Sequence, residues 1–231
     1  MTDFLWGPRP QPARGPRPAL TLERIADAAV SIADAEGLAA VSMQRVAADL
    51  GFTKMSLYRY LPGKTELVAL MVERAVGAPP APESAGPHSP AWRDGLKAWA
   101  HGLLGHYQRH PWLLEAVPMI RPLGPGELGW MESAMALLDG TGLTAAERLD
   151  TMAVLAGQVR VIAQQTRESR QPEAHVLAAI WAALRDHGDR FPAMSATMAE
   201  ASAGGGQDQA FDFGLERILD GLQALIDHRS G

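Results

Sequence analysis

The spacing of apolar residues predicts helices along almost the whole chain. In residues 22–33 the apolar side chains recur every three or four positions and share one helix face: Leu22, Ile25, Ala26, Ala29, Ile32 and Ala33. Thr21 can cap this helix, and Gly37 can end it. Residues 19–61, 91–110, 126–171 and 193–231 contain no proline, and no segment shows the period of two that is typical of strands. We therefore predict an all-α fold with about nine or ten helices.

Two proline clusters divide this helical pattern. Five prolines fall within residues 8–18 and five within residues 79–90. Proline lacks a backbone N–H and does not fit the interior of a helix. We therefore expect a flexible arm at residues 1–20 and a linker at residues 78–90. Between them lies a small module, residues 21–77, and after the linker a larger one, residues 91–231.

Two short helices joined by a glycine turn are predicted within residues 42–61. Ser42 can cap the first helix, and Gly51 stands where a chain leaving a helix needs a positive φ. Thr53 can cap the second, on which Leu57 and Leu61 face the core. Such a pair is a helix-turn-helix, and the side chains left outward suit the major groove of DNA: Lys54, Met55, Ser56, Tyr58 and Tyr60.

The distribution of charge is compatible with this interpretation. The net charge is −5, but the chain through Ala78 carries 9 Lys/Arg against 8 Asp/Glu, and the remainder 12 against 18. Such asymmetry alone is usually a solvated surface. Lys64, at the start of the next predicted helix, can hold a backbone phosphate together with the free helix N–H groups. For Arg9, Arg14 and Arg17 in the arm we expect a solvated tail, with a DNA contact as the alternative.

Composition and motifs give no sign of catalysis or of a membrane span. The chain has no cysteine, which excludes disulfides, a cysteine nucleophile and thiolate metal sites. Its longest apolar run, residues 176–184, is far shorter than the ~20 residues of a membrane helix. His106 and His110 lie one helical turn apart but lack a third metal ligand. We expect no catalytic site, no metal and no cofactor.

Residues 21–77 resemble the DNA-binding domain of the tetracycline-repressor (TetR) family. The motifs that carry the resemblance are Val46-Ala47-x-x-Leu50-Gly51 and Tyr58-x-Tyr60-Leu61-x-x-Lys64-x-x-Leu67, with Leu61 where most members have Phe. The resemblance implies that these side chains touch DNA: Gln44, Thr53, Lys54, Met55, Ser56, Tyr58, Tyr60 and Lys64. Gln44 and Lys54 are the best candidates for reading bases, because glutamine suits adenine and lysine suits guanine. For Tyr60, packing between helices is an equal alternative.

The C-terminal part is similar to the effector-binding domain of tetracycline repressors. The motifs are His110-Pro111-Trp112, Arg121-Pro122 and the apolar pattern of residues 211–222. The resemblance implies a homodimer through the helices near residues 144–168 and 208–228. It also implies an effector cavity lined by Trp99, Leu103, Ile120, Arg121, Met131, Met135, Leu155 and Gln158, each of which core packing would also explain. The segment before Arg121 lacks the magnesium-ligating histidine of the tetracycline repressors, so a magnesium–tetracycline ligand is not expected.

Taken together, these features predict a dimeric, ligand-responsive transcriptional regulator and not an enzyme. It would bind double-stranded DNA at a palindromic operator, act as a repressor in the cytoplasm, and be associated with the nucleoid when bound. An unknown small-molecule effector would release it. The alternative is a helical small-molecule binding protein or enzyme that has lost DNA binding. Lys54, Tyr58 and Lys64 argue against that alternative, because a protein without DNA binding has no need to retain them.

Overall fold

The computed structural model describes residues 3–7, 20–79, 91–168, 172–204 and 210–230. Within these residues it holds helices and no strand, which confirms the all-α prediction. The described residues form twelve α-helices, more than the nine or ten expected, together with two 3₁₀ turns, Leu38–Ala40 and Gly188–Arg190. Two of the additional helices, α1 (Asp3–Trp6) and α7 (Leu113–Ala116), have four residues each. A single turn is too short for a hydrophobic period to reveal it.

Helix α1 corrects the expectation that residues 1–20 form an arm without helix. It precedes the first proline, Pro8, so no proline ring restricts its backbone. Leu5 is buried, and the Trp6 indole N–H donates to the Leu123 carbonyl over 3.0 Å. The start of the chain therefore packs against the loop after α7. The rest of the expected arm, residues 8–19, and residues 80–90 of the expected linker lie outside the described residues.

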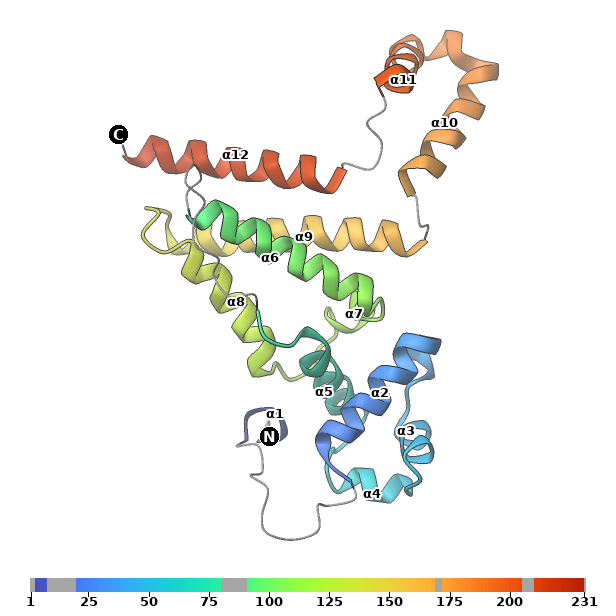
Figure 1. The fold of residues 1–231 in the computed structure, drawn as a ribbon, viewed down its shortest axis with the longest axis vertical. Coiled ribbons are helices and arrows are strands. Elements are labelled where there is room, and N and C mark those ends of the chain that lie inside the picture. Colours follow the sequence, from blue (N-terminus) through green and yellow to red (C-terminus); the bar gives the residue numbers. More distant parts are fainter. Residues whose placement is uncertain (1–2, 8–19, 80–90, 169–171, 205–209, 231) are drawn as a thin grey trace.

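Four helices lie together at one end of the molecule (Figure 1): α2 (Leu22–Glu36), α3 (Met43–Asp49), α4 (Lys54–Tyr58) and α5 (Lys64–Val76). Two of the three predicted caps are confirmed, because Thr21 accepts from the Arg24 N–H and Ser42 accepts from the Arg45 N–H. Gly37 ends α2 with φ +86°. These signals act within one helical turn, so local sequence is sufficient to specify them.

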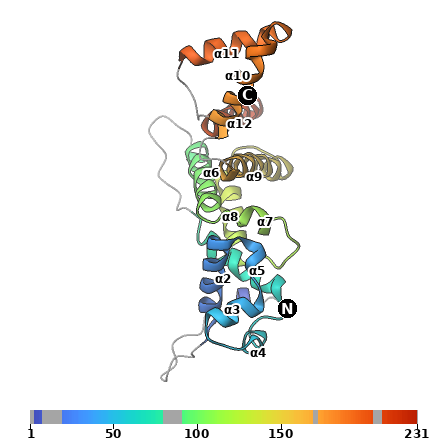
Figure 2. The same ribbon diagram turned by 90° about the vertical axis from the view of Figure 1, so that its right-hand side faces the viewer.

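The remaining helices build a larger body. Its central layer contains α6 (Ala91–Arg109), α9 (Ala145–Glu168) and α12 (Ala210–Ser230), and α8 (Pro125–Leu137) packs on α5, α6 and α9. Helices α9 and α12 lie side by side and run in opposite directions (Figure 1). Helices α10 (Pro172–His187) and α11 (Pro192–Gly204) lie at the end of the molecule opposite α4 (Figure 2).

Two glycines allow α8 to approach α6 closely. A Cβ atom on Gly102 would lie 2.8 Å from the Trp130 ring, and one on Gly95 would lie 2.2 Å from the Leu137 side chain. Both distances are shorter than packed carbon atoms tolerate, so the absence of a side chain sets the separation of the two helices. Gly105, on the same helix, has open space where its Cβ would stand.

We predict that alanine has opposite effects on stability at Gly105 and at Gly102 of α6. Gly105→Ala should raise the free energy of unfolding by about 0.5–1 kcal/mol, because alanine is the better helix former and meets no neighbour. Gly102→Ala gains the same helix propensity but must displace the buried Trp130 ring, so its unfolding free energy should fall below that of Gly105→Ala and of wild type. Urea unfolding followed by circular dichroism measures both, and equal stability of the two variants would contradict the close packing.

Candidate functional site

The orientation of α4 is fixed by two leucines and a tight turn. Leu57 and Leu61 are fully buried, one helical turn apart. Before α4, Gly51 has φ +75°, and the Phe52 N–H donates to the Ala47 carbonyl over 2.8 Å. A helix of five residues is not stable by itself, so burial of these leucines holds it in place, with α3 as its main neighbour. Its opposite face is thereby turned to solvent.

That exposed face carries the predicted DNA-contacting residues. Seven of them are exposed and Ser56 is half-buried: Gln44, Thr53, Lys54, Met55, Tyr58, Tyr60 and Lys64. The Lys54 ammonium lies 5.4 Å from the centre of the Tyr58 ring, a cation–π distance. The Thr53 hydroxyl contacts the Ser56 hydroxyl at 3.0 Å and makes no cap to the helix backbone, which differs from the expected cap. Of this set, Lys54, Met55, Ser56 and Tyr58 lie on α4 and Thr53 directly precedes it, whereas Gln44 lies on α3 and Lys64 begins α5.

Tyr60 has a structural role. Its hydroxyl donates to the Leu20 carbonyl over 2.9 Å, which links the end of α4 to the residue before the α2 cap. The side chain is nonetheless 38% exposed. The hydroxyl thus has a structural partner, more than a third of the residue is exposed, and both expected roles of Tyr60 stay predictions.

Some of the exposed basic side chains at this end have a carboxylate partner, and others have none among the described residues. Within the described residues, Lys54, Arg59 and Lys64 have no carboxylate at ion-pair distance. Arg45 instead pairs with Glu36, and Arg74 with Asp27 of α2. Three cations around one short exposed helix form a positive surface suited to a phosphate backbone. The motif analysis did not place Arg59 among the DNA contacts; its exposure beside Tyr58 adds it to this surface.

A carboxylate of α2 joins this end to the helical body. Oδ1 of Asp34, on α2, accepts from the Trp112 indole N–H over 2.7 Å and lies 2.8 Å from Nδ1 of His110. Trp112 is almost fully buried and directly precedes α7. Asp34 was not identified from the sequence, because its partners lie more than 70 residues away and no spacing rule connects them.

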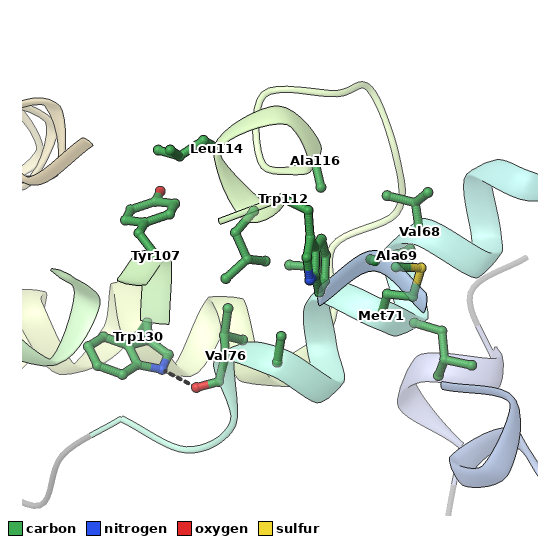
Figure 3. Packing of buried hydrophobic residues seen from close by; sticks show 14 of the residues in the cluster. Val68, Ala69, Met71, Val76, Tyr107, Trp112, Leu114, Ala116 and Trp130 are labelled. Carbon is green, nitrogen blue, oxygen red and sulfur yellow. Dashed lines mark hydrogen bonds between the residues drawn. The ribbon is translucent and has the colours of Figure 1, made fainter. Parts of the chain in front are cut away.

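Helix α5 is the second connection, and its C-terminal end is held by side chains of the body. The Trp130 indole N–H donates to the Val76 carbonyl over 3.1 Å (Figure 3). His106 makes a hydrogen bond to the backbone of Ala75, and burial lowers the pKa of His106, which favours the neutral ring. The Gly126 N–H donates to the Glu73 carboxylate over 2.7 Å. Movement of α6 or α8 would therefore reach α5 directly.

The residues expected to line an effector cavity are distributed over α6, α8 and α9, which pack on one another. Trp99 and Leu155 are buried, and the Trp99 indole N–H donates to the Trp130 carbonyl over 2.9 Å. Leu103, Met135 and Gln158 are half-buried, and Met131 is exposed. The Gln158 amide lies against Gly214 of α12, where a Cβ would be 2.5 Å from Nε2.

Two residues of that expected set are placed elsewhere. Ile120 is fully exposed in the loop between α7 and α8, so it lines no cavity in this conformation. The Arg121 guanidinium is buried and makes a two-bond pair with Glu127, at 2.5 and 2.7 Å, and a further bond to the Ala116 carbonyl. These bonds occupy it within the fold, so an effector carboxylate or carbonyl would have to compete with Glu127, and the anchoring role stays a prediction. Buried charges need such partners.

Helices α9 and α12 expose apolar residues on the outside of the body. On α9, Leu149, Val154 and Val161 are each more than half exposed, and Gly157 has open space around its Cβ position. On α12, Phe213 is 63% exposed. Three exposed apolar residues along α9, with a fourth on the adjacent α12, are more than isolated surface residues and are typical of an interface. We call this surface the α9–α12 face.

Within the described residues, no helix is both long and apolar enough to span a bilayer. The same residues contain no cluster of three or more histidine or acidic side chains that could hold a metal ion. His106 and His110, the pair with metal-ligand spacing, are engaged with the Ala75 backbone and with Asp34 respectively.

Two family descriptions match the chain. Residues 19–71 match the bacterial regulatory proteins of the tetR family, and residues 86–226 match the tetracyclin repressor-like C-terminal domain. The chain is 41% identical over 239 residues to the HTH-type transcriptional repressor DrrR1 of Streptomyces coeruleorubidus, covering 99% of this chain and 87% of the relative. An HTH-type transcriptional regulator of Saccharopolyspora erythraea is 31% identical over 221 residues, covering 94% of this chain and 90% of the relative.

Solved structures give the same assignment. Apo ActR from Streptomyces coelicolor is 26% identical with a TM-score of 0.75, covering 92% of this chain and 99% of that one. ActR in complex with actinorhodin is 28% identical with a TM-score of 0.74, covering 89% and 96%. With the exposed helix-turn-helix, the two family matches and these relatives in agreement, the chain belongs to the tetR family of DNA-binding transcriptional regulators.

Proposed function

We propose that the protein is a repressor that binds a palindromic operator as a homodimer and is released by a small-molecule effector. Residues 21–77 form the DNA-binding domain and residues 91–231 the effector-binding and dimerisation domain. The protein acts in the cytoplasm, on the nucleoid when bound. The observation that carries the proposal is the exposed face of α4, with Lys54, Arg59 and Lys64 unpaired among the described residues.

In this proposal α4 enters the major groove. Gln44 and Lys54 read base edges, because their amide and ammonium groups match adenine and guanine. Tyr58, with the Lys54 ammonium over its ring, supplies apolar contact to the groove wall. Lys64, at the first residue of α5, holds a phosphate together with the helix N-terminus. Thr53, Met55, Ser56 and the ring edge of Tyr60 complete the contact surface.

Lysine variants test this assignment on the protein's own upstream DNA, after footprinting has located the operator. Lys64→Gln should weaken binding to all sequences and flatten the slope of log affinity against log salt by about 0.9 per lost contact, hence about 1.8 for a dimer. Lys54→Gln should instead reduce the preference for operator over mutated half-sites. Lys97→Gln is the matched control, because Lys97 pairs with Glu216 of α12, far from α4. An unchanged salt slope for Lys64→Gln would exclude it from the phosphate contacts.

The dimer forms through the α9–α12 face. Two such faces related by a two-fold axis bury the exposed apolar side chains of both protomers in a four-helix arrangement. Gly157 would then lie close to the partner, since it has no side chain and open space in front of it. The two α4 helices could in this way reach successive major grooves, ~34 Å apart.

A large side chain at Gly157 should separate the protomers without unfolding them. Arginine is a good helix former and meets no atom within 4 Å of its Cβ in the isolated protomer, so Gly157→Arg should fold normally. In light scattering coupled to size exclusion, wild type should show twice the 24.7 kDa chain mass, and Gly157→Arg should shift towards one chain. Ala136→Arg, on the exposed face of α8, controls for the added charge and should stay dimeric. A dimeric Gly157→Arg would place the interface elsewhere.

The effector is a small molecule of the kind that ActR binds, of which actinorhodin is the named example. We place it between α6, α8 and α9, near Trp99, Leu103, Met131, Met135, Leu155 and Gln158. The indole of Trp130 connects this region to α5 through Val76. An effector that displaced α8 would pull on α5, and an effector that displaced α7 would pull on Asp34 of α2. Either movement changes the spacing of the two α4 helices and favours release.

Two aspartates of α2 allow the connection to the body to be tested. Asp34→Ala leaves the buried Trp112 N–H without an acceptor, so the free energy of unfolding should fall by about 1–3 kcal/mol. Asp27→Ala breaks an exposed ion pair with Arg74 within the DNA-binding end and should cost about 0–1 kcal/mol. Differential scanning calorimetry compares the two. If both variants lost the same free energy of unfolding, the bond of Asp34 to Trp112 would be worth no more than the exposed ion pair of Asp27.

A further inference from the structure

The first helix of the chain, α1, lies outside both segments that match the tetR family, residues 19–71 and 86–226. Its side chains nevertheless belong to the hydrophobic core: Leu5 is buried, and Phe4 packs half-buried against the same cluster. The third residue of this apolar run, Trp6, donates its indole N–H to the Leu123 carbonyl, 117 residues further along the chain. We call residues 3–6 the N-terminal strap.

The strap docks on the loop between α7 and α8, which runs from one attachment of the DNA-binding end to the other. At its start, α7 directly follows Trp112, the side chain that Asp34 of α2 holds. At its end, Gly124 lies so close to Glu73 of α5 that a Cβ atom would stand 2.2 Å from the carboxylate. Leu123, which accepts the bond from the strap, directly precedes Gly124. Figure 1 shows α1 below the start of α8.

The loop itself buries little apolar side chain against the body. Met119 and Leu123 are exposed, and Ile120 is completely so. From the side of α8, the loop is held by the pair of Arg121 with Glu127. The strap adds a buried leucine and a hydrogen bond to the loop backbone at the position next to α5.

We propose that the N-terminal strap is a positioning element, which docks reversibly and fixes the α7–α8 loop between the attachments to α2 and α5. A helix of four residues is not stable by itself, so the strap is helical only while docked. Its anchors are the buried Leu5, the half-buried Phe4 and one hydrogen bond, and Trp6 is 49% exposed. Undocking therefore costs much less free energy than unfolding of the core.

The consequence for DNA binding rests on the function proposed above. With the strap undocked, the loop moves more freely, and α2 and α5 lose a fixed common support. The two α4 helices must then be ordered at the half-site spacing when DNA binds, which costs binding free energy. A docked strap removes this cost without touching a phosphate. Strap variants should therefore bind the operator more weakly, with an unchanged salt slope.

Hydrogen exchange measured by mass spectrometry on the full-length protein tests docking directly. The peptides to follow cover residues 117–128 and include the Gly126 amide, which donates to the carboxylate of α5. Leu5→Ala should speed their exchange by about tenfold or more, because burial of a leucine is worth at least that factor. Trp6→Phe keeps a ring and loses only the donor, so the increase should be several-fold.

Two matched variants and a reference segment separate docking from a general loss of stability. Leu5→Met nearly conserves the side-chain volume and should exchange as wild type does. Trp181→Phe makes the same ring change at an exposed position of α10 and should leave residues 117–128 unaffected. Residues 42–61 should exchange at the wild-type rate in every variant. Unchanged exchange of residues 117–128 in Leu5→Ala, or an equal increase in residues 42–61, would overturn the proposal.

Gel-shift titrations over a salt series measure the consequence for DNA. Leu5→Ala should bind the operator several-fold more weakly than wild type, with the same slope of log affinity against log salt. A slope flattened by about 0.9 per lost contact would assign the strap to the phosphate contacts and overturn its positioning role. Unchanged operator affinity beside faster loop exchange would overturn it as well. Failure of wild type to bind the operator would contradict the proposed function, whereas the exchange result would still decide whether the strap holds the loop.

Discussion

Asp34 accepts hydrogen bonds from side chains of the helical body, and through them the DNA-binding end is joined to the rest of the molecule. The Trp112 indole N–H is almost fully buried, so loss of its acceptor would leave an unsatisfied donor in the core. Helix α2 therefore cannot turn relative to α7 without breaking this bond or carrying Trp112 with it. Helix α3 packs on α2, and α4 packs on α3, so the placement of α2 bears on the direction of both.

Helix α5 makes the same connection through its backbone. The last carbonyls of a helix have no partner within the helix, and here the Trp130 indole and the His106 ring satisfy two of them. Both side chains come from α6 and α8, the helices that carry Trp99, Leu103, Met131 and Met135, four of the eight expected effector-contacting residues. The DNA-binding end is thus attached at two separate points, α2 and α5. A change that moves α7 alone acts on α2, and a change that moves α8 alone acts on α5. In either case we expect the DNA-binding end to tilt, because its other attachment remains in place.

Residues whose role is set by local backbone could be predicted from the sequence. Ser42 caps α3 and Gly51 turns with positive φ because each depends only on neighbours within one turn. Arg121 could not be placed in this way: the motif gave its position in the chain, but its burial against Glu127 depends on how the loop before α8 folds. Asp34 was missed for the same reason, since its importance arises from residues far along the chain.

A protein with a net charge of −5 can still bind DNA, because the charges act over short distances. At physiological ionic strength an exposed charge is screened within ~8 Å. Glu216 and Asp220 lie on α12, on the far side of the body from α4 (Figure 1), and both are paired with basic residues of α6 or α12. They contribute little to the field at Lys54 and Lys64. The local balance around α4 decides whether a phosphate backbone is attracted, and there Glu36 and Asp27 of α2 are already engaged by Arg45 and Arg74.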